Sequence, residues 1–237
     1  MTSSVEIVLP VLNEERDLPS STAKLHQFLS SNLGSYRWRV LIADNGSTDS
    51  TPDVATGLSR DYEEVGYLRL DERGRGRALR KTWLESDADI LAYMDVDLST
   101  DLDSLPAVIS SVDVEGYDIA IASRLIKGAH VIGRPFNREL ISRAYSLTVR
   151  GMFFARVRDF QCGFKAISRR AATELVPLVQ DNGWFFDSEL LILAEKNGYR
   201  IREIPVRWTD DPDSRVRIVS TAYGDMMGLL RLRFGGL

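Results

Sequence analysis

The chain has 237 residues, 44% of them hydrophobic and 27% charged, a composition that indicates a globular protein and excludes a disordered one. Its single cysteine, Cys162, excludes an internal disulfide, and with only two histidines no Cys/His zinc cluster can form. No run of about 18 uncharged apolar residues could span a bilayer, and no N-terminal signal precedes the strand-like residues 5–9. We therefore expect a cytoplasmic protein without a transmembrane segment.

The net charge of −4 is unevenly distributed along the chain. Residues 124–158 carry eight Lys or Arg against one acid, Glu139, which makes this segment +7 and leaves −11 elsewhere. A basic segment in an acidic protein indicates a surface for an anionic partner: a phosphate, a lipid headgroup or a nucleic acid. A solvated helix face is the alternative interpretation.

Short apolar runs alternate with helical patterns in the first half of the chain. Strands are predicted at residues 5–11, 38–43, 65–70 and 90–94, and helices at 15–31 and 77–86. Further along, strands are expected at 118–122, 164–168 and 201–206, and helices at 168–175 and 187–197, the last ending at Gly198. In the basic segment, one set of residues suits the apolar face of a helix: Leu140, Ile141, Ala144, Tyr145, Leu147 and Thr148. This order predicts an α/β fold, a single domain with a mostly parallel sheet flanked by helices.

Three polar loops follow three of these strands. They are Pro-Val-Leu-Asn-Glu at 10–14, Asp-Asn-Gly-Ser-Thr-Asp at 44–49 and Asp-Val-Asp at 95–97. Each alone has an ordinary explanation as a helix cap or a turn. Because parallel strands bring such loops to one edge of the sheet, together they predict a polar pocket, where the two aspartates could share a metal.

These three motifs, in this order and spacing, resemble the nucleotide-sugar-binding half of family 2 glycosyltransferases, which have the Rossmann-like GT-A fold. The resemblance implies that residues 1–123 bind the nucleotide sugar and that residues 124–237 form an acceptor-binding half with interfacial helices. It assigns one set of residues to the nucleotide sugar: Pro10, Leu12, Asn13, Glu14, Asp44, Gly46, Asp95, Val96 and Asp97. Arg75, at the start of a predicted helix, is expected to contact the diphosphate or the base, and a solvated basic loop is the alternative interpretation. Leu12 stands where the family usually has an aromatic residue, so a stacking contact to the base is not expected from it.

The second half resembles the polyprenyl-phosphate and dolichyl-phosphate glycosyl synthases through residues 159–165, 186–191 and 204–208. This resemblance implies that Arg124, Arg138 and Ser142 hold a lipid phosphate and that Gln161 lies in the acceptor wall. Where the glucosyl synthases carry Gly-Ser-Lys, this chain has Asp213-Ser214-Arg215.

The reaction implied is transfer of a hexose from a nucleotide sugar to a polyprenyl phosphate with inversion. UDP-glucose is the first expectation for the donor and GDP-mannose the second. Oxygen ligands suit Mg²⁺ or Mn²⁺, so Asp97 and Asp95 are the predicted metal ligands, and Asp97, Arg124 and Arg138 the predicted catalytic residues. A phosphate acceptor is already largely dianionic and needs no general base.

Two other functions remain open. A hydroxyl acceptor would need a base such as Asp187 or Glu189, although both also suit an N-cap and first-turn acid of a helix. A non-catalytic nucleotide-sugar-binding protein is the other alternative.

A lipid acceptor requires contact with a membrane. The basic helix with residues 152–154, and the apolar and basic segment 221–237, have the composition of interfacial helices, although core packing explains them equally well. We expect peripheral association with the cytoplasmic face of a membrane, directly or through a transmembrane partner subunit, and no nucleic-acid partner.

Overall fold

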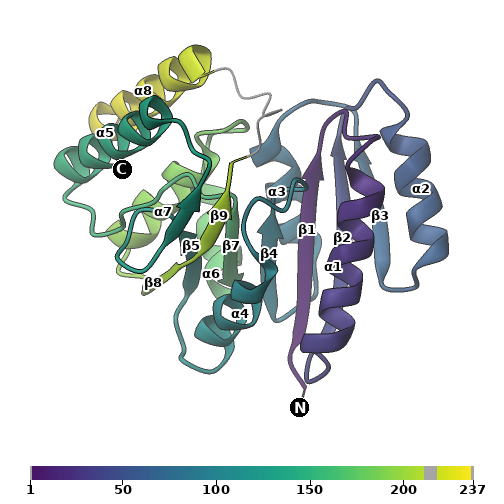
Figure 1. The fold of residues 1–237 in the computed structure, drawn as a ribbon. Helices are drawn as coiled ribbons and strands as arrows, with labels where there is room; N and C mark the ends of the chain where they lie inside the picture. Colours follow the sequence, from purple (N-terminus) through teal and green to yellow (C-terminus); the bar gives the residue numbers. More distant parts are fainter. Residues whose placement is uncertain (1, 211–217, 236–237) are drawn as a thin grey trace.

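A seven-stranded sheet runs through the protein in the order β3, β2, β1, β4, β7, β5, β8 (Figure 1). The structure, a computed structural model, describes residues 2–210 and 218–235. The strands of this sheet are β1 (Ser4–Val11), β2 (Arg37–Asn45), β3 (Val65–Leu70), β4 (Ile90–Met94), β5 (Ile119–Ser123), β7 (Phe164–Ser168) and β8 (Ile201–Pro205). A smaller parallel sheet pairs β6 (His130–Ile132) with β9 (Arg207–Thr209).

The predicted mostly parallel sheet is confirmed, with one reversed strand. β1 is parallel to β2 and β4, β2 to β3, and β5 to β8, whereas β7 is antiparallel to both β4 and β5. β7 begins at Phe164 opposite Met94, the last residue of β4. The chain just before β7 therefore lies at the carboxyl end of β4, beside the Asp-Val-Asp motif.

Helices cover both faces of the sheet (Figure 1). They are α1 (Leu18–Asn32), α2 (Thr51–Asp61), α3 (Arg75–Glu85), α4 (Leu105–Asp113), α5 (Phe136–Phe153), α6 (Arg169–Leu175), α7 (Phe186–Lys196) and α8 (Ile218–Phe234), with 3₁₀ turns at Leu102–Ser104 and Val176–Leu178. Successive residues of a strand point to opposite faces, so in β1 Val8 joins one core while Ile7 and Leu9 join the other. The helix predicted at 187–197 is confirmed within a residue, and Gly198 follows it with a left-handed φ of 78°.

The helix predicted in the basic segment is confirmed as α5, and several of the apolar side chains predicted for one of its faces lie outside the core. α5 buries Ser146, Val149 and Phe153, whereas Leu140, Ile141 and Leu147 are 56%, 44% and 64% exposed. α5 packs beside α8, and its outer apolar side chains face away from the core. Across the described residues, no helix combines the length and the hydrophobicity that crossing a membrane requires.

Candidate active site

The first two polar loops interlock at the carboxyl ends of β1 and β2. The backbone N–H of Asn13 donates to Ser47 Oγ at 2.9 Å, and that of Thr48 donates back to Asn13 Oδ1 at 2.8 Å. The N–H of Glu14 donates to Thr51 Oγ1 at 2.8 Å. Asn13 has a left-handed φ of 58°, a conformation that Asn tolerates better than most residues. The two motifs therefore form one rigid wall, as their positions in the sequence predict.

Asp44 is fully buried at the base of this wall. Its Oδ1 accepts a hydrogen bond from the N–H of Ser47 at 2.8 Å, and Oδ2 accepts one from Tyr67 Oη at 3.3 Å. Gly46 turns the chain with φ of 86°. Pro10 is the next-to-last residue of β1 and pairs with Ala43 of β2. The predicted nucleotide-binding residues of the first two loops therefore lie at one edge of the sheet.

The Asp-Val-Asp motif meets the chain that precedes β7. The N–H of Asp95 donates to the carbonyl of Gly163 at 2.9 Å. A Cβ on residue 163 would lie only 1.6 Å from Asp95 Oδ2, so only glycine allows the Asp95 carboxylate its present position. Val96 points into the core, while the side chain of Asp95 is 42% exposed and Asp97 is exposed. The two carboxylates therefore remain accessible at the sheet edge.

Arg75, at the start of α3, connects Asp95 to a buried charge cluster. Its Nη2 donates to Asp95 Oδ1 at 2.8 Å, and Nη1 forms a short ion pair with Asp187 of α7. Its guanidinium lies 4.7 Å from the ring centre of Tyr93 and 5.1 Å from that of Trp184. Arg75 thus orients Asp95 as well as adding positive charge beside it.

Asp187 is the anionic centre of this cluster. Lys165 Nζ lies 3.0 Å from its Oδ1, and the Tyr93 hydroxyl donates to the same oxygen. Burial alone would raise the pKa of Asp187, but Lys165 and Arg75 outweigh it and hold that pKa below its usual value. Asp187 is therefore an ionised structural partner and a weak base.

Glu189, also in α7, is hydrogen-bonded to residues outside the cluster around Asp187. Its Oε2 accepts from the N–H of Asp181 at 2.8 Å and from Arg231 Nη2 of α8 at 2.7 Å, while Oε1 is buried without a hydrogen-bond partner. It joins α7 to α8, and the carboxylate is fully buried.

Asp97 faces a groove on the α1 side of the edge. The groove, of about 610 Å³, is bordered by Lys24 and Phe28 of α1, by Leu98 and by Arg207 of β9. Within the described residues, no cluster of three or more His, Cys, Asp or Glu is arranged to hold a metal. Asp95 and Asp97 offer hard carboxylate oxygens suited to Mg²⁺ or Mn²⁺, but such an ion would need further ligands from a bound diphosphate or water.

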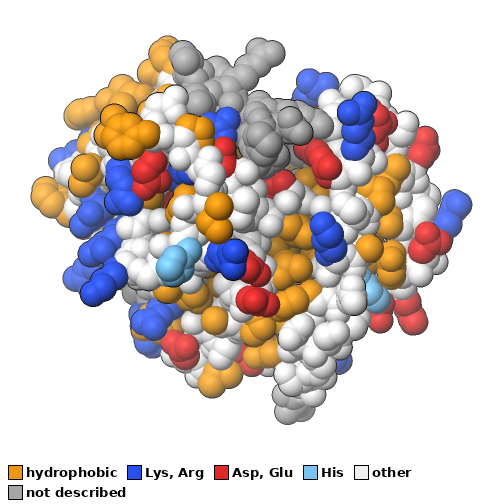
Figure 2. All heavy atoms as spheres, viewed as in Figure 1, with side chains coloured by type: hydrophobic (Ala, Val, Ile, Leu, Met, Phe, Trp, Pro, Cys, Tyr) orange, Lys and Arg blue, Asp and Glu red, His pale blue; other side chains and the backbone are white. Residues whose placement is uncertain are grey.

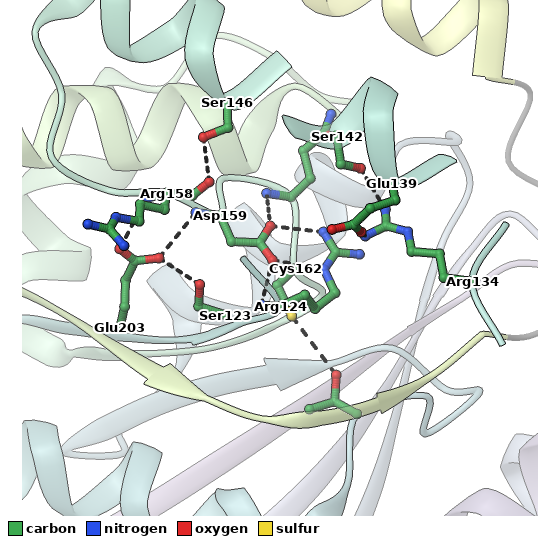
Figure 3. Close-up of polar contacts among 12 residues, drawn as sticks. Ser123, Arg124, Arg134, Glu139, Ser142, Ser146, Arg158, Asp159, Cys162 and Glu203 are labelled. Carbon is green, nitrogen blue, oxygen red and sulfur yellow. Dashed lines mark hydrogen bonds and ion pairs between the residues drawn. The ribbon is translucent and has the colours of Figure 1, made fainter. Parts of the chain in front are cut away.

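Arg124, directly after β5, is held by a buried carboxylate (Figure 3). Its Nε and Nη2 donate to Asp159 Oδ2 and Oδ1 at 2.8 and 2.9 Å, and its backbone N–H donates to the same carboxylate at 2.9 Å. Burial would raise the pKa of Asp159, but Arg124 lowers it to about 2. Glu203 in turn accepts from the N–H groups of Arg158 and Asp159 and from Ser123 Oγ, which fixes this loop.

The other predicted acceptor residues each have a polar partner. Ser142 Oγ accepts from Arg134 Nη2 at 2.6 Å, and Arg138 Nη1 contacts Asp210 at 3.2 Å (Ser142 and Arg134 in Figure 3). Gln161 lies two residues from Asp159 and donates its amide to Asp225 of α8 at 2.7 Å. Burial raises the pKa of the neighbouring Cys162 thiol to about 11, so Cys162 acts as an inert, packed side chain.

Three residues of the site were not assigned from the sequence. Asp159 and Lys165 lie in the motif at 159–165, so the sequence indicates that they are near the site. It does not indicate their ion-pair partners, Arg124 and Asp187. Arg134 lay in the +7 segment, and the charge count was the only sequence signal for it. The stretch Asp213-Ser214-Arg215, expected near the donor, lies outside the described residues.

Interlocked loops at the carboxyl ends of β1 and β2, with an Asp-x-Asp motif after β4, are the arrangement that the resemblance to the GT-A fold predicts. Residues 6–176 match the family described as Glycosyl transferase family 2, and the chain belongs to this family. The family resemblance predicted from the three motifs is thereby confirmed.

Several curated proteins are similar over most of this chain. Glycosyltransferase AglD of Haloferax volcanii is 36% identical over 228 residues, which cover 96% of this chain and 36% of that protein. The dolichyl-phosphate beta-glucosyltransferases of Drosophila melanogaster and Saccharomyces cerevisiae are 33% and 28% identical, each over 90% of this chain and 69% of its own length. The chain thus spans about a third of the length of the first relative and about two thirds of the other two.

Solved structures share the fold. Glucosyl-3-phosphoglycerate synthase of Mycobacterium tuberculosis in complex with UDP superposes with a TM-score of 0.73 at 20% identity, covering 98% of this chain and 80% of that one. The same enzyme with Mn²⁺ and UDP-glucose gives a TM-score of 0.72 at 19% identity, covering 98% and 79%. These likenesses confirm the GT-A fold.

Proposed function

We propose that the chain transfers a hexose from a nucleotide sugar to a polyprenyl or dolichyl phosphate, with inversion and with a divalent metal. UDP-glucose is the first expectation for the donor and GDP-mannose the second. Similar proteins named dolichyl-phosphate beta-glucosyltransferase, and structural neighbours crystallised with UDP-glucose and Mn²⁺, support this reaction class.

The observation that carries the proposal is the segment 159–163, which contacts both halves of the site. At one end Asp159 holds Arg124, and at the other the carbonyl of Gly163 accepts from the N–H of Asp95. A short segment of chain therefore connects the arginine proposed to bind the acceptor phosphate, Arg124, with a carboxylate proposed to serve the donor, Asp95. An acceptor phosphate bound at Arg124 would lie near that carboxylate. Such proximity favours direct attack, because orientation of the two reactants supplies much of the rate.

On the donor side, Asp95 and Asp97 would hold Mg²⁺ or Mn²⁺ together with diphosphate oxygens. The metal supplies positive charge that stabilises the departing diphosphate. Arg75 keeps Asp95 oriented through its 2.8 Å contact, and the wall formed by Asn13, Glu14 and Asp44 would bind the nucleoside.

On the acceptor side, the chemistry needs positive charge and orientation more than a base. A phosphate monoester is largely dianionic at neutral pH, and guanidinium groups bind it through paired hydrogen bonds. Two of the residues proposed for this role are linked through Arg134, which donates to Ser142 Oγ and, like Arg124, lies beside the ring of Trp208. Arg138 lies one helical turn before Ser142 in α5.

A sugar-hydroxyl acceptor is the less favoured alternative, because both residues considered as bases are engaged. Asp187 is ion-paired with Lys165 and Arg75, and Glu189 is tied to Arg231. Loss of activity in Asp187→Asn would not by itself identify a base, since the variant also leaves Lys165 unpaired. A shift of the pH optimum in that variant, with transfer to a hydroxyl and not to a lipid phosphate, would favour this alternative.

We also propose that α5 and α8 touch the cytoplasmic face of a membrane. Exposed apolar side chains, among them Phe136 and Phe234, lie on these helices, and the exposed Phe154 directly follows α5. The same helices carry Arg143 and Arg233, and Figure 2 shows orange and blue side chains gathered in this region. Apolar groups next to arginines suit the interface of anionic lipids. Phe154→Ser should reduce co-flotation with anionic vesicles, and unchanged flotation would refute the proposed surface.

The test is transfer of radiolabelled sugar from UDP-glucose or GDP-mannose into organic-extractable polyprenyl phosphate, with Mg²⁺, Mn²⁺ or EDTA. We expect metal-dependent label in the lipid phase with one donor, and its loss in Arg138→Ala. Arg156→Ala, which removes an exposed charge from the same basic segment, is the control. Nucleotide-sugar binding without transfer to any lipid phosphate would refute the proposal and favour a hydroxyl acceptor or a non-catalytic binding protein.

A further inference from the structure

Arg134 is a buried arginine that no family motif assigns. It lies between β6 and α5, and only 9% of its side chain is exposed. Nη1 contacts Glu139 Oε2 at 3.2 Å and Nη2 donates to Ser142 Oγ at 2.6 Å, but the buried Nε–H has no hydrogen-bond partner. A buried donor without an acceptor is costly, and the protein's own groups leave this guanidinium incompletely satisfied.

A second guanidinium lies close to the first. Arg124 and Arg134 are 5.5 and 5.4 Å from the ring centre of Trp208. Burial lowers the pKa of Arg134, and the charge of Arg124 lowers it further. Two neighbouring cations that lower each other's pKa in this way are stabilised by an anion that binds beside them.

The carboxylates beside the two arginines differ in how firmly they are held. Asp159 makes two side-chain bonds and one backbone bond to Arg124 and is nearly fully buried. Glu139 makes a single 3.2 Å contact with Arg134 and is 24% exposed, and its other oxygen accepts from Arg143 Nε at 2.7 Å, one helical turn further along. Glu139 can therefore leave Arg134 and keep an ion-pair partner, whereas Asp159, if displaced from Arg124, would be a buried carboxylate without its arginine.

We propose that Arg134 and Ser142 form a phosphate monoester subsite in which Glu139 stands in for the acceptor phosphate (Figure 3). When the phosphate binds, it takes the place of the Glu139 carboxylate at Nη1 and shares the Nη1/Nη2 fork of Arg134 with Ser142, while Glu139 stays on Arg143. Arg124, fixed by Asp159, supplies charge without changing partner. This inference rests on the proposed function and adds to it a binding residue and an exchange of counter-ions.

The test measures binding apart from transfer. Isothermal titration calorimetry at fixed ionic strength would use a short-chain prenyl phosphate, the matching prenyl alcohol and inorganic phosphate. Arg134→Gln should weaken binding of the prenyl phosphate about tenfold or more, since it loses a charge-assisted hydrogen bond. Arg134→Lys keeps the positive charge but loses the paired donors of the guanidinium, so its affinity for the prenyl phosphate should lie between those of wild type and Arg134→Gln.

Glu139→Gln is the more decisive variant, because the proposed subsite predicts that it binds prenyl phosphate more tightly than wild type does. Removing the competing charge should tighten prenyl-phosphate binding and lower its KM, by about threefold or more, while the KM of the donor stays unchanged. Glu63→Gln, which removes an exposed carboxylate beside β3, and Arg156→Ala are the matched controls and should bind as wild type does. Circular dichroism melting of each variant separates lost binding from lost folding.

The outcomes separate the subsite from the proposed function. Transfer to lipid phosphate in the wild type, with unchanged or weaker binding in Glu139→Gln and unchanged binding in Arg134→Gln, would refute the subsite and leave the function standing. Binding of inorganic phosphate that depends on Arg134, with no lipid transfer by the wild type, would support the subsite and refute the lipid acceptor. A wild type that binds no phosphate monoester would refute both.

Discussion

Asp225 on α8 is a buried carboxylate whose protonation should control stability near neutral pH. Only 3% of the residue is exposed, and its Oδ2 accepts from Gln161 Nε2 at 2.7 Å. Burial is the main cause that raises its pKa to about 7, and the negative charges of Asp181 and Asp187 add to the effect, against the hydrogen bond from Gln161. The carboxyl group therefore keeps its proton in the folded protein at pH values where it has lost it in the unfolded chain.

The size of the effect follows from the two pKa values. The folded value of about 7 exceeds the ordinary 3.8 by about three units, and each unit corresponds to about 1.4 kcal/mol. Between pH 4 and 7 the folded state binds more protons than the unfolded state, so the contribution of Asp225 is fully present at low pH and is lost as the pH rises through 7. Asn cannot ionise, and we expect Asp225→Asn to be more stable than wild type by about 2 to 4 kcal/mol at pH 8, allowing for screening.

Urea unfolding at a series of pH values from 4 to 8 would measure this difference. The gap between Asp225→Asn and wild type should be small at pH 4 and should widen towards pH 8, with an unchanged dependence on urea concentration. Glu63→Gln, at the opposite end of the sheet, is the control for loss of an exposed carboxylate and should follow wild type. A gap that stays constant from pH 4 to 8, or that widens towards low pH, would show that the proton is not held as this burial requires.

Three further predictions concern the site. Asp159→Ala should lower the free energy of unfolding by about 3 to 5 kcal/mol in urea, because it leaves the buried guanidinium of Arg124 unpaired, and a loss below about 1 kcal/mol would contradict a buried pair. Gly163→Ala places a Cβ 1.6 Å from Asp95 Oδ2, so Asp95 must move, and Mn²⁺-dependent UDP binding measured by calorimetry should weaken; wild-type affinity would show that Asp95 serves neither metal nor donor. Asp97→Asn should reduce transfer by about a hundredfold or more through loss of a metal ligand, with an unchanged melting temperature, and retained activity would remove Asp97 from the site.

Local patterns in the sequence predict most of the sheet. The apolar runs 65–70, 90–94 and 164–168 match β3, β4 and β7 residue for residue, because each is bounded by polar or turn residues. The reversed direction of β7 is not encoded in such a run, since parallel and antiparallel strands share the same apolar pattern. α2 and α4 were not predicted, and β6 and β9 are three-residue strands too short to show a period.

The sequence predicts which residues lie together more readily in the proposed donor half than in the proposed acceptor half, because of where the contacting residues lie in the chain. Asn13 and Asp95 lie just after β1 and β4, and Asp44 is the next-to-last residue of β2, so parallel topology alone brings them to one edge. Arg124 and Asp159 are 35 positions apart, and Arg75 and Asp187 are 112 apart, so no local pattern pairs them. Net charge located the basic segment but could not separate Arg124, whose carboxylate is fixed, from Arg134, whose carboxylate has a second partner in Arg143. That difference depends on burial and on hydrogen-bond counts, and it decides which arginine is available to an incoming phosphate.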